Sequence, residues 1–152
     1  MISYQYVEVK PLKSLKKRQL NHALKKLVDL EGFVLQDLSI VFCSDDYLLG
    51  VNRSYLKHDY FTDIITFDYS AQGKLNGDLF ISIDRVMENH EAWNTTFGEE
   101  LLRVVFHGVL HLCGYKDKSP KEKQIMRNKE NLYLDLFVSR ETKNPLYVSR
   151  ET

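Results

Sequence analysis

The stretch that decides the fold is Phe97–Asp117, which reads FGEELLRVVFHGVLHLCGYKD. Its first part, Phe97–Leu112, predicts a long helix whose second half is mostly apolar. A helix with so little polar surface belongs in the middle of a fold. We expect it to end at Gly114, because glycine readily takes the left-handed conformation of a helix C-cap.

The same stretch carries a pattern of metal ligands. His107 and His111 are four residues apart, so both imidazoles lie on one helix face, where they can share one ion. Past Gly114 the chain can turn back, and among the next three residues only Asp117 has a good ligand group. The spacing is that of the metzincin zinc motif H-x-x-x-H-x-x-G-x-x-H, with Asp as third donor. Three protein ligands indicate a catalytic zinc site with an open position, although nickel or another first-row divalent ion suits the same donors.

The motif lacks the general base of the zinc proteases. In H-E-x-x-H enzymes a glutamate follows the first histidine, whereas here that position is Gly108. Glu100 lies seven residues before His107 and therefore on the same helix face, where it could orient a ligand or accept a proton. The alternative for Glu100 is a solvent-facing acid that complements the helix dipole.

Hydrophobic periodicity predicts the other elements. We expect strands at 3–9, 34–43, 63–69 and 78–83. We expect helices at 12–30, at 45–56 with Asp45 and Asp46 as caps, at 85–93, and from Ser119 to about 137. The last helix opens on the capping box Ser119-Pro120-Lys121-Glu122, and Asn76-Gly77 predicts a turn within 73–77.

These elements predict an α+β fold. It is a single domain, with a mixed four-stranded sheet packed against helices and a central buried helix that bears the metal ligands. We expect one hydrolase domain at 1–137 and a polar C-terminal tail at 138–152, in which V-S-R-E-T occurs twice.

The composition excludes several other classes of protein. The 152 residues are 43% apolar, with only 7 Gly and 3 Pro, which is typical of one globular core and not of a disordered chain. The apolar stretches are too short for a membrane span, and Met1–Lys10 lacks the apolar block of a signal peptide. Two cysteines are too few for a disulfide framework. We therefore expect a cytoplasmic protein without a membrane partner.

The formal net charge of zero conceals two basic segments. Lys10–Lys26 holds seven basic residues and no acid, and Lys116–Lys129 holds six basic residues against two acids. Together these segments carry a net charge of +11, and the rest of the chain carries −11. They are either solvated helix faces or a footprint for a phosphate backbone.

Three stretches resemble the YbeY endoribonuclease family. His107–Asp117, HGVLHLCGYKD, resembles the family's H-G-x-L-H-L-x-G-Y-D-H. Val51–Phe67, VNRSYLKHDYFTDIITF, resembles L-N-x-x-Y-R-x-x-D-x-P-T-D-V-L-S-F, and Gly77–Ser82, GDLFIS, resembles G-D-I-x-I-S. The matches follow the family's order and cover about half of the chain.

The resemblance implies a metal-dependent endonuclease for single-stranded RNA that acts in ribosomal RNA maturation and ribosome quality control. It implies zinc at His107, His111 and position 117, where the family has His and this chain has Asp. It also implies ribosomal RNA, with small-subunit proteins or assembly factors, as partners. The family's arginine after the tyrosine is replaced by Leu56, so another cation must offset the charge on the phosphate; the candidates are Lys57, Lys116 and Lys118.

The sequence is also compatible with two other functions. One is a metal-dependent peptidase or amidase, which the spacing favours and Gly108 opposes. The other is a ribosome-associated binder with a structural metal, which the loss of the arginine at Leu56 favours. Four aromatic side chains near the strands could stack on bases or simply pack in the fold: Tyr60, Phe61, Tyr69 and Phe80.

Overall fold

The computed structural model describes residues 1–138, and its strands form one mixed sheet. The strands are β1 (Ile2–Val7), β2 (Val34–Cys43), β3 (Ile64–Asp68) and β4 (Lys74–Ser82). Their order in the sheet is β1-β2-β4-β3. Both β1 and β4 run parallel to β2, whereas β3 pairs antiparallel with β4. The prediction of a mixed four-stranded sheet is confirmed.

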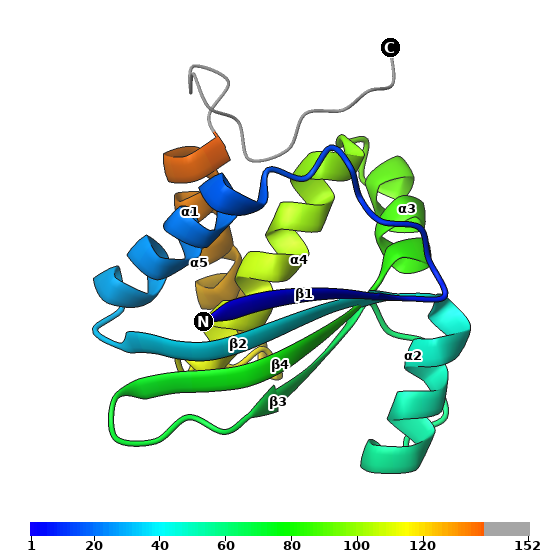
Figure 1. Ribbon diagram of the computed structural model, residues 1–152, viewed down its shortest axis with the longest axis horizontal. Coiled ribbons are helices and arrows are strands. Elements are labelled where there is room, and N and C mark those ends of the chain that lie inside the picture. The colour runs from blue at the N-terminus through cyan, green and yellow to red at the C-terminus, as the bar shows by residue number, and fades with distance from the viewer. Residues whose placement is uncertain (139–152) are drawn as a thin grey trace.

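Helices pack on both faces of this sheet, four on one face and one, through Leu48 and Val51, on the other face beside Cys43 and Ile65. They are α1 (Lys17–Leu30), α2 (Asp45–Val51), α3 (Ile83–Ala92), α4 (Phe97–Leu112) and α5 (Pro120–Val138), with a π-helical turn η1 (Asn52–Leu56) after α2. Figure 1 shows α1, α3, α4 and α5 above the sheet, with α4 in the middle and α2 set apart at one end. Among residues 1–138, none of the helices combines the length and apolar character needed to cross a membrane.

The central helix α4 packs tightly on the sheet through two glycines. At Gly77 of β4, a Cβ atom would lie 2.7 Å from Cδ1 of Leu112 and 2.8 Å from the carbonyl oxygen of Phe67. At Gly108 of α4, a Cβ would lie 2.7 Å from Cδ1 of Ile64. The predicted bounds of α4 and its burial are confirmed, since most of its residues are inaccessible to solvent.

The predicted turn within 73–77 is wrong. Asn76 and Gly77 lie inside β4, and the chain reverses earlier, at Gln72 and Gly73, which both have positive φ. Gly77 is explained by the close approach of Leu112 and not by a turn.

The predicted start of α2 at Asp45 is confirmed, but its predicted caps and the predicted start of α1 are wrong. Ser44, not Asp45 or Asp46, caps α2, because its Oγ accepts a hydrogen bond from the backbone N–H of Tyr47. Helix α1 begins at Lys17, after an irregular segment, and not at Leu12. The capping box of α5 is confirmed, since Glu122 N–H donates to Ser119 Oγ and Ser119 N–H donates to Glu122 Oε1. Of the predicted tail at 138–152, Val138 is the last residue of α5, and the rest lies outside the described residues.

Candidate metal centre and its pocket

The three predicted ligands converge at the C-terminal end of α4. The backbone N–H of Cys113 still bonds to helix carbonyls, and Gly114 then takes a φ of 105°, which turns the chain back. As a result Asp117 Oδ2 lies 3.1 Å from Nε2 of His107 and 3.3 Å from Nε2 of His111. One ligand atom from each residue lies within 4.8 Å of the others.

The geometry of these donors fits a divalent ion. Ligand atoms at about 2.0–2.1 Å from a tetrahedral zinc are roughly 3.3 Å apart, close to the separations at Asp117. Each histidine also has an acceptor for its other ring nitrogen. His107 Nδ1 is 2.6 Å from Glu130 Oε2, and His111 Nδ1 is 2.9 Å from the carbonyl oxygen of Tyr115. A proton on each Nδ1 leaves both Nε2 lone pairs facing Asp117.

Glu130 of α5 is the buried partner of the centre. It is only 4% exposed, and its second oxygen accepts a hydrogen bond of 3.0 Å from Arg103 Nη1. Burial acts to raise the pKa of Glu130, but the bonds with His107 and Arg103 and the charge of Arg127 outweigh it and lower that pKa. Burial acts to lower the pKa of His107, but the bond with Glu130 and nearby carboxylates outweigh it and raise that pKa.

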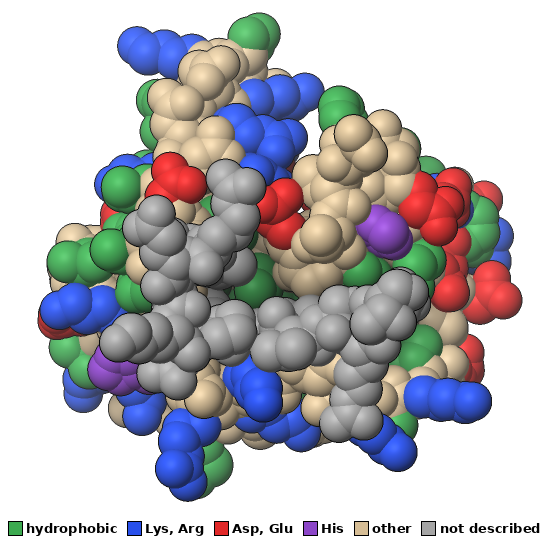
Figure 2. Space-filling view, turned by 90° about the horizontal axis from the view of Figure 1, so that it is seen from above, with side chains coloured by type: hydrophobic (Ala, Val, Ile, Leu, Met, Phe, Trp, Pro, Cys, Tyr) green, Lys and Arg blue, Asp and Glu red, His purple; other side chains and the backbone are tan. Residues whose placement is uncertain are grey.

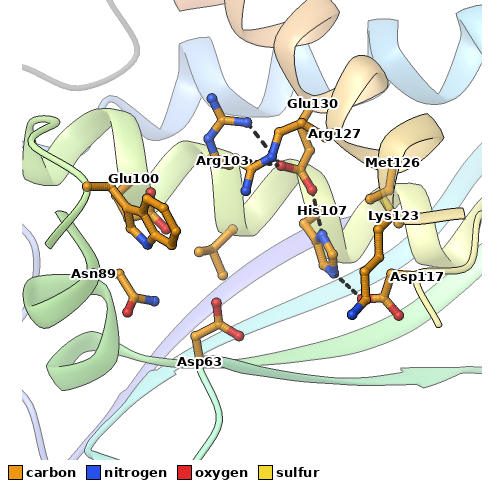
Figure 3. A pocket seen from close by; sticks show the side chains of 12 residues that line it. Asp63, Asn89, Glu100, Arg103, His107, Asp117, Lys123, Met126, Arg127 and Glu130 are labelled. Carbon is orange, nitrogen blue, oxygen red and sulfur yellow. Dashed lines mark hydrogen bonds and ion pairs between the residues drawn. The ribbon is translucent and has the colours of Figure 1, made fainter. Parts of the chain in front are cut away.

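His107 and Asp117 open into a pocket of about 360 Å³ between α3, α4 and α5 (Figure 3). Two further carboxylates line it: Asp63, just before β3, and Glu100, in the first turn of α4. Burial raises the pKa of both. The cationic side chains that line the pocket are Arg103, Lys123 and Arg127.

The predicted residues are only partly brought together. Glu100 lies in the pocket and is 7% exposed, so the alternative of a solvent-facing acid is wrong. Among the described residues, the hydrogen-bonded partner of His107 Nδ1 is Glu130 and not Glu100. Lys57 and Lys116 do not line the pocket, and neither does Lys118. Lys57 caps the η1 turn beside α2, and Lys116 occupies an exposed position of the loop that directs Asp117 to the histidines.

The basic segments are divided by the fold. Helix α1 packs on β2 and contributes no residue to the pocket, whereas α5 contributes Lys123 and Arg127. Figure 2 looks down on the helices and shows Lys and Arg side chains gathered mainly at two opposite edges, with Asp and Glu gathered at the right edge. Only the second segment, Lys116–Lys129, places charge at the candidate site.

Glu130 and Asp63 had no predicted role, although the sequence contains a signal for each. Glu130 interrupts the apolar stripe of α5, which is formed by Met126, Tyr133, Leu134 and Phe137. A buried acid on such a stripe needs a charged or hydrogen-bonded partner. Asp63 belongs to the stretch Val51–Phe67 that resembles the family, at the point where a strand begins.

The fold and the site define a class: an α+β protein with a candidate divalent-metal centre at the end of its central helix, inside a pocket equipped with acids and cations. Residues 3–138 match the protein family described as Endoribonuclease YbeY. The chain belongs to the YbeY family.

Curated relatives and a solved structure agree with this assignment. The chain is 48% identical over 132 residues to the protein named Endoribonuclease YbeY of Parabacteroides distasonis, covering 87% of this chain and 93% of the relative. It is 53% identical over 114 residues to the protein of that name in Cytophaga hutchinsonii, covering 74% and 80%. The solution structure of TM1509 from Thermotoga maritima matches with a TM-score of 0.67 and 26% identity, covering 97% of both chains.

Proposed function

We propose that this chain is a metal-dependent endoribonuclease that cuts single-stranded RNA in ribosomal RNA maturation and ribosome quality control. The proposal places it in the cytoplasm, with small-subunit proteins or assembly factors as partners. Membership of the family supports the activity. The observation that carries the proposal is the convergence of His107, His111 and Asp117, because His107 and Asp117 line a pocket that also holds acids and cations.

The proposed metal is zinc, one ion per chain, held by His107 Nε2, His111 Nε2 and a carboxylate oxygen of Asp117. Two imidazoles and a carboxylate suit zinc, and nickel is a second choice for the same donors. When bound, such an ion supplies activated water and polarises a phosphoryl oxygen.

The chain's own residues supply positioning, charge and proton transfer. Glu130 fixes the ring of His107 and is itself held by Arg103. Lys123 and Arg127 offset the negative charge that develops on the phosphate. Glu100 and Asp63, whose raised pKa values favour the protonated form, can give a proton to the leaving oxygen or take one from the attacking group.

The position after the first histidine argues against a peptidase. Residue 108 faces Ile64 and Leu79 of the sheet and not the pocket. A glutamate there would displace packed side chains and would not reach the space beside the ligands. The structural-metal alternative is disfavoured because His107 and Asp117 both line the pocket, so an ion held there would face the space that a substrate can enter.

The test is an incubation of purified protein with single-stranded RNA and, separately, with unfolded casein, each with and without a chelator. We expect RNA cleavage that stops with the chelator and returns with zinc, and no cleavage of casein. His107→Ala should lose both metal and activity, while His22→Ala, an exposed histidine of α1, keeps both. Cleavage of RNA by metal-free His107→Ala protein would refute the site.

A further inference from the structure

The pocket ends at the only tryptophan of the chain. Trp93 follows the last turn of α3 and lines the same pocket as His107 and Asp117, yet it is 68% exposed. A single exposed aromatic side chain needs no explanation on an ordinary surface. At the mouth of a pocket that holds a candidate metal centre, it is a large flat surface available to whatever enters.

The backbone at Trp93 is fixed. Its N–H donates to the carbonyl oxygen of Asn89 at 2.9 Å, so the residue is the C-cap of α3. Asn94 then takes a left-handed conformation with a φ of 56°, and Thr95 N–H donates to the carbonyl oxygen of His90 at 3.0 Å. The indole is therefore attached to a hydrogen-bonded helix end, so less backbone entropy is lost when a ligand binds there.

The wall opposite α3 is basic. Helix α5 contributes Lys123 and Arg127, both exposed, and α4 contributes Arg103. Asn89 lies on the α3 side of the pocket, across from His107 and Lys123 (Figure 3). Cations that follow a phosphate backbone, together with an aromatic ring on which a base can stack, are the two parts of a site for single-stranded nucleic acid.

We propose that Trp93 stacks on an unpaired base of the RNA while the adjoining phosphates lie against Lys123 and Arg127. This proposal rests on the proposed function and assigns a base subsite to it. Every base has a π face, so the subsite accepts all four bases. It selects against a duplex, because paired bases already stack on each other and cannot cover the indole.

Because Trp93 is the only tryptophan, its fluorescence reports on this subsite alone. We expect a single-stranded RNA to quench the tryptophan emission in a saturable manner when mixed rapidly with the zinc-loaded protein, before cleavage proceeds. The same sequence in a duplex should leave the emission unchanged. Equal quenching by both forms, or none by either, overturns the proposal.

Substitution separates stacking from simple packing. Trp93→Ala should raise KM for single-stranded RNA on the order of five-fold to a hundred-fold, with a much smaller change in kcat. Trp93→Phe, which keeps a ring, should restore most of the lost affinity. Tyr69→Ala tests a competing aromatic side chain that could also stack on bases: Tyr69 is 62% exposed, follows the end of β3 and does not line this pocket. A larger rise in KM for Tyr69→Ala than for Trp93→Ala contradicts the assignment.

An abasic nucleotide gives the last comparison. The abasic site is moved along the RNA one position at a time. We expect one position at which the missing base weakens RNA binding by the wild-type protein but does not further weaken RNA binding by Trp93→Ala. Additive losses at every position overturn the proposal. If the wild-type protein does not cleave RNA at all, the proposed function is wrong. If it cleaves RNA but shows none of the expected Trp93 effects, only the base subsite is wrong.

Discussion

The carboxylate of Glu31 accepts a hydrogen bond of 2.7 Å from the phenol of Tyr115, although 84 residues separate the two. Glu31 lies just past the end of α1, and Tyr115 lies in the loop that brings Asp117 to the histidines. The same carboxylate receives Lys129 Nζ at 3.0 Å and the phenol of Tyr133, both from α5. One acid, whose side chain is 8% exposed, thus joins α1, the loop that carries Asp117 and α5.

We expect Glu31→Gln to destabilise the protein by about 1–3 kcal/mol at neutral pH, because a charge-assisted network loses its charge. Burial acts to raise the pKa of Glu31, but hydrogen bonds from Tyr115, Tyr133 and Lys129 outweigh it and hold that pKa below its ordinary value of 4.5. Urea denaturation of both proteins at neutral pH measures the difference. Glu91→Gln, at an exposed position of α3, is the control and should change little.

The same pair of proteins gives a pH dependence. A carboxyl group with a lowered pKa in the folded state adds stability above its unfolded pKa, and that stability is lost as pH falls through the folded pKa. The advantage of wild type over Glu31→Gln should therefore be complete at neutral pH and shrink as the pH falls below about 4.5. A difference that stays constant down to acid unfolding would contradict the role given to the charge.

Glu130→Gln should weaken zinc binding about 10-fold to 100-fold, the usual effect of removing an outer hydrogen-bond partner of a metal ligand. The amide can still accept a bond from His107 but no longer carries the charge that raises the basicity of the ring. Competition with a chelating dye measures the affinity. Glu99 is an exposed acid in the first turn of α4, so Glu99→Gln should bind zinc as the wild-type protein does. Equal losses of zinc affinity in both variants would contradict a role for Glu130 at the metal centre.

Gly77→Ala should destabilise the fold by about 1–3 kcal/mol, because the new Cβ meets both Leu112 and the backbone oxygen of Phe67. Gly50→Ala is the matched control. It lies in α2 with nothing within 4 Å of the new Cβ, so it should be neutral or mildly stabilising. Thermal unfolding measures the melting temperature of both variants, and equal melting temperatures would contradict the prediction.

Lys123→Ala should raise KM for RNA and reduce the slope of log KM against log salt by about one, the loss of one phosphate contact. Lys74→Ala, at the distant start of β4, is the comparison and should leave the slope unchanged. If both variants shift the slope equally, the basic character of the surface as a whole, and not the pocket, attracts the RNA.

The local part of the site could be predicted from the sequence, and its long-range part could not. The ligands follow from helical spacing and a glycine C-cap, which depend only on neighbours in the chain. Glu130, Glu31 and Trp93 acquire their roles through packing between distant elements, and no periodicity identifies which helix ends meet. The turn chemistry of Asn76-Gly77 was misleading for the same reason, since the contact with Leu112 decides that position.

The order of the residues along the chain has a consequence for synthesis. All three candidate metal ligands have been added by Asp117, but the acid that contacts His107 comes at position 130 and the lysine that pairs with Glu31 at position 129. During synthesis the candidate ligands are therefore present before the residues that hold them in position. The candidate metal centre is therefore completed only when the last described helix, α5, packs against α4.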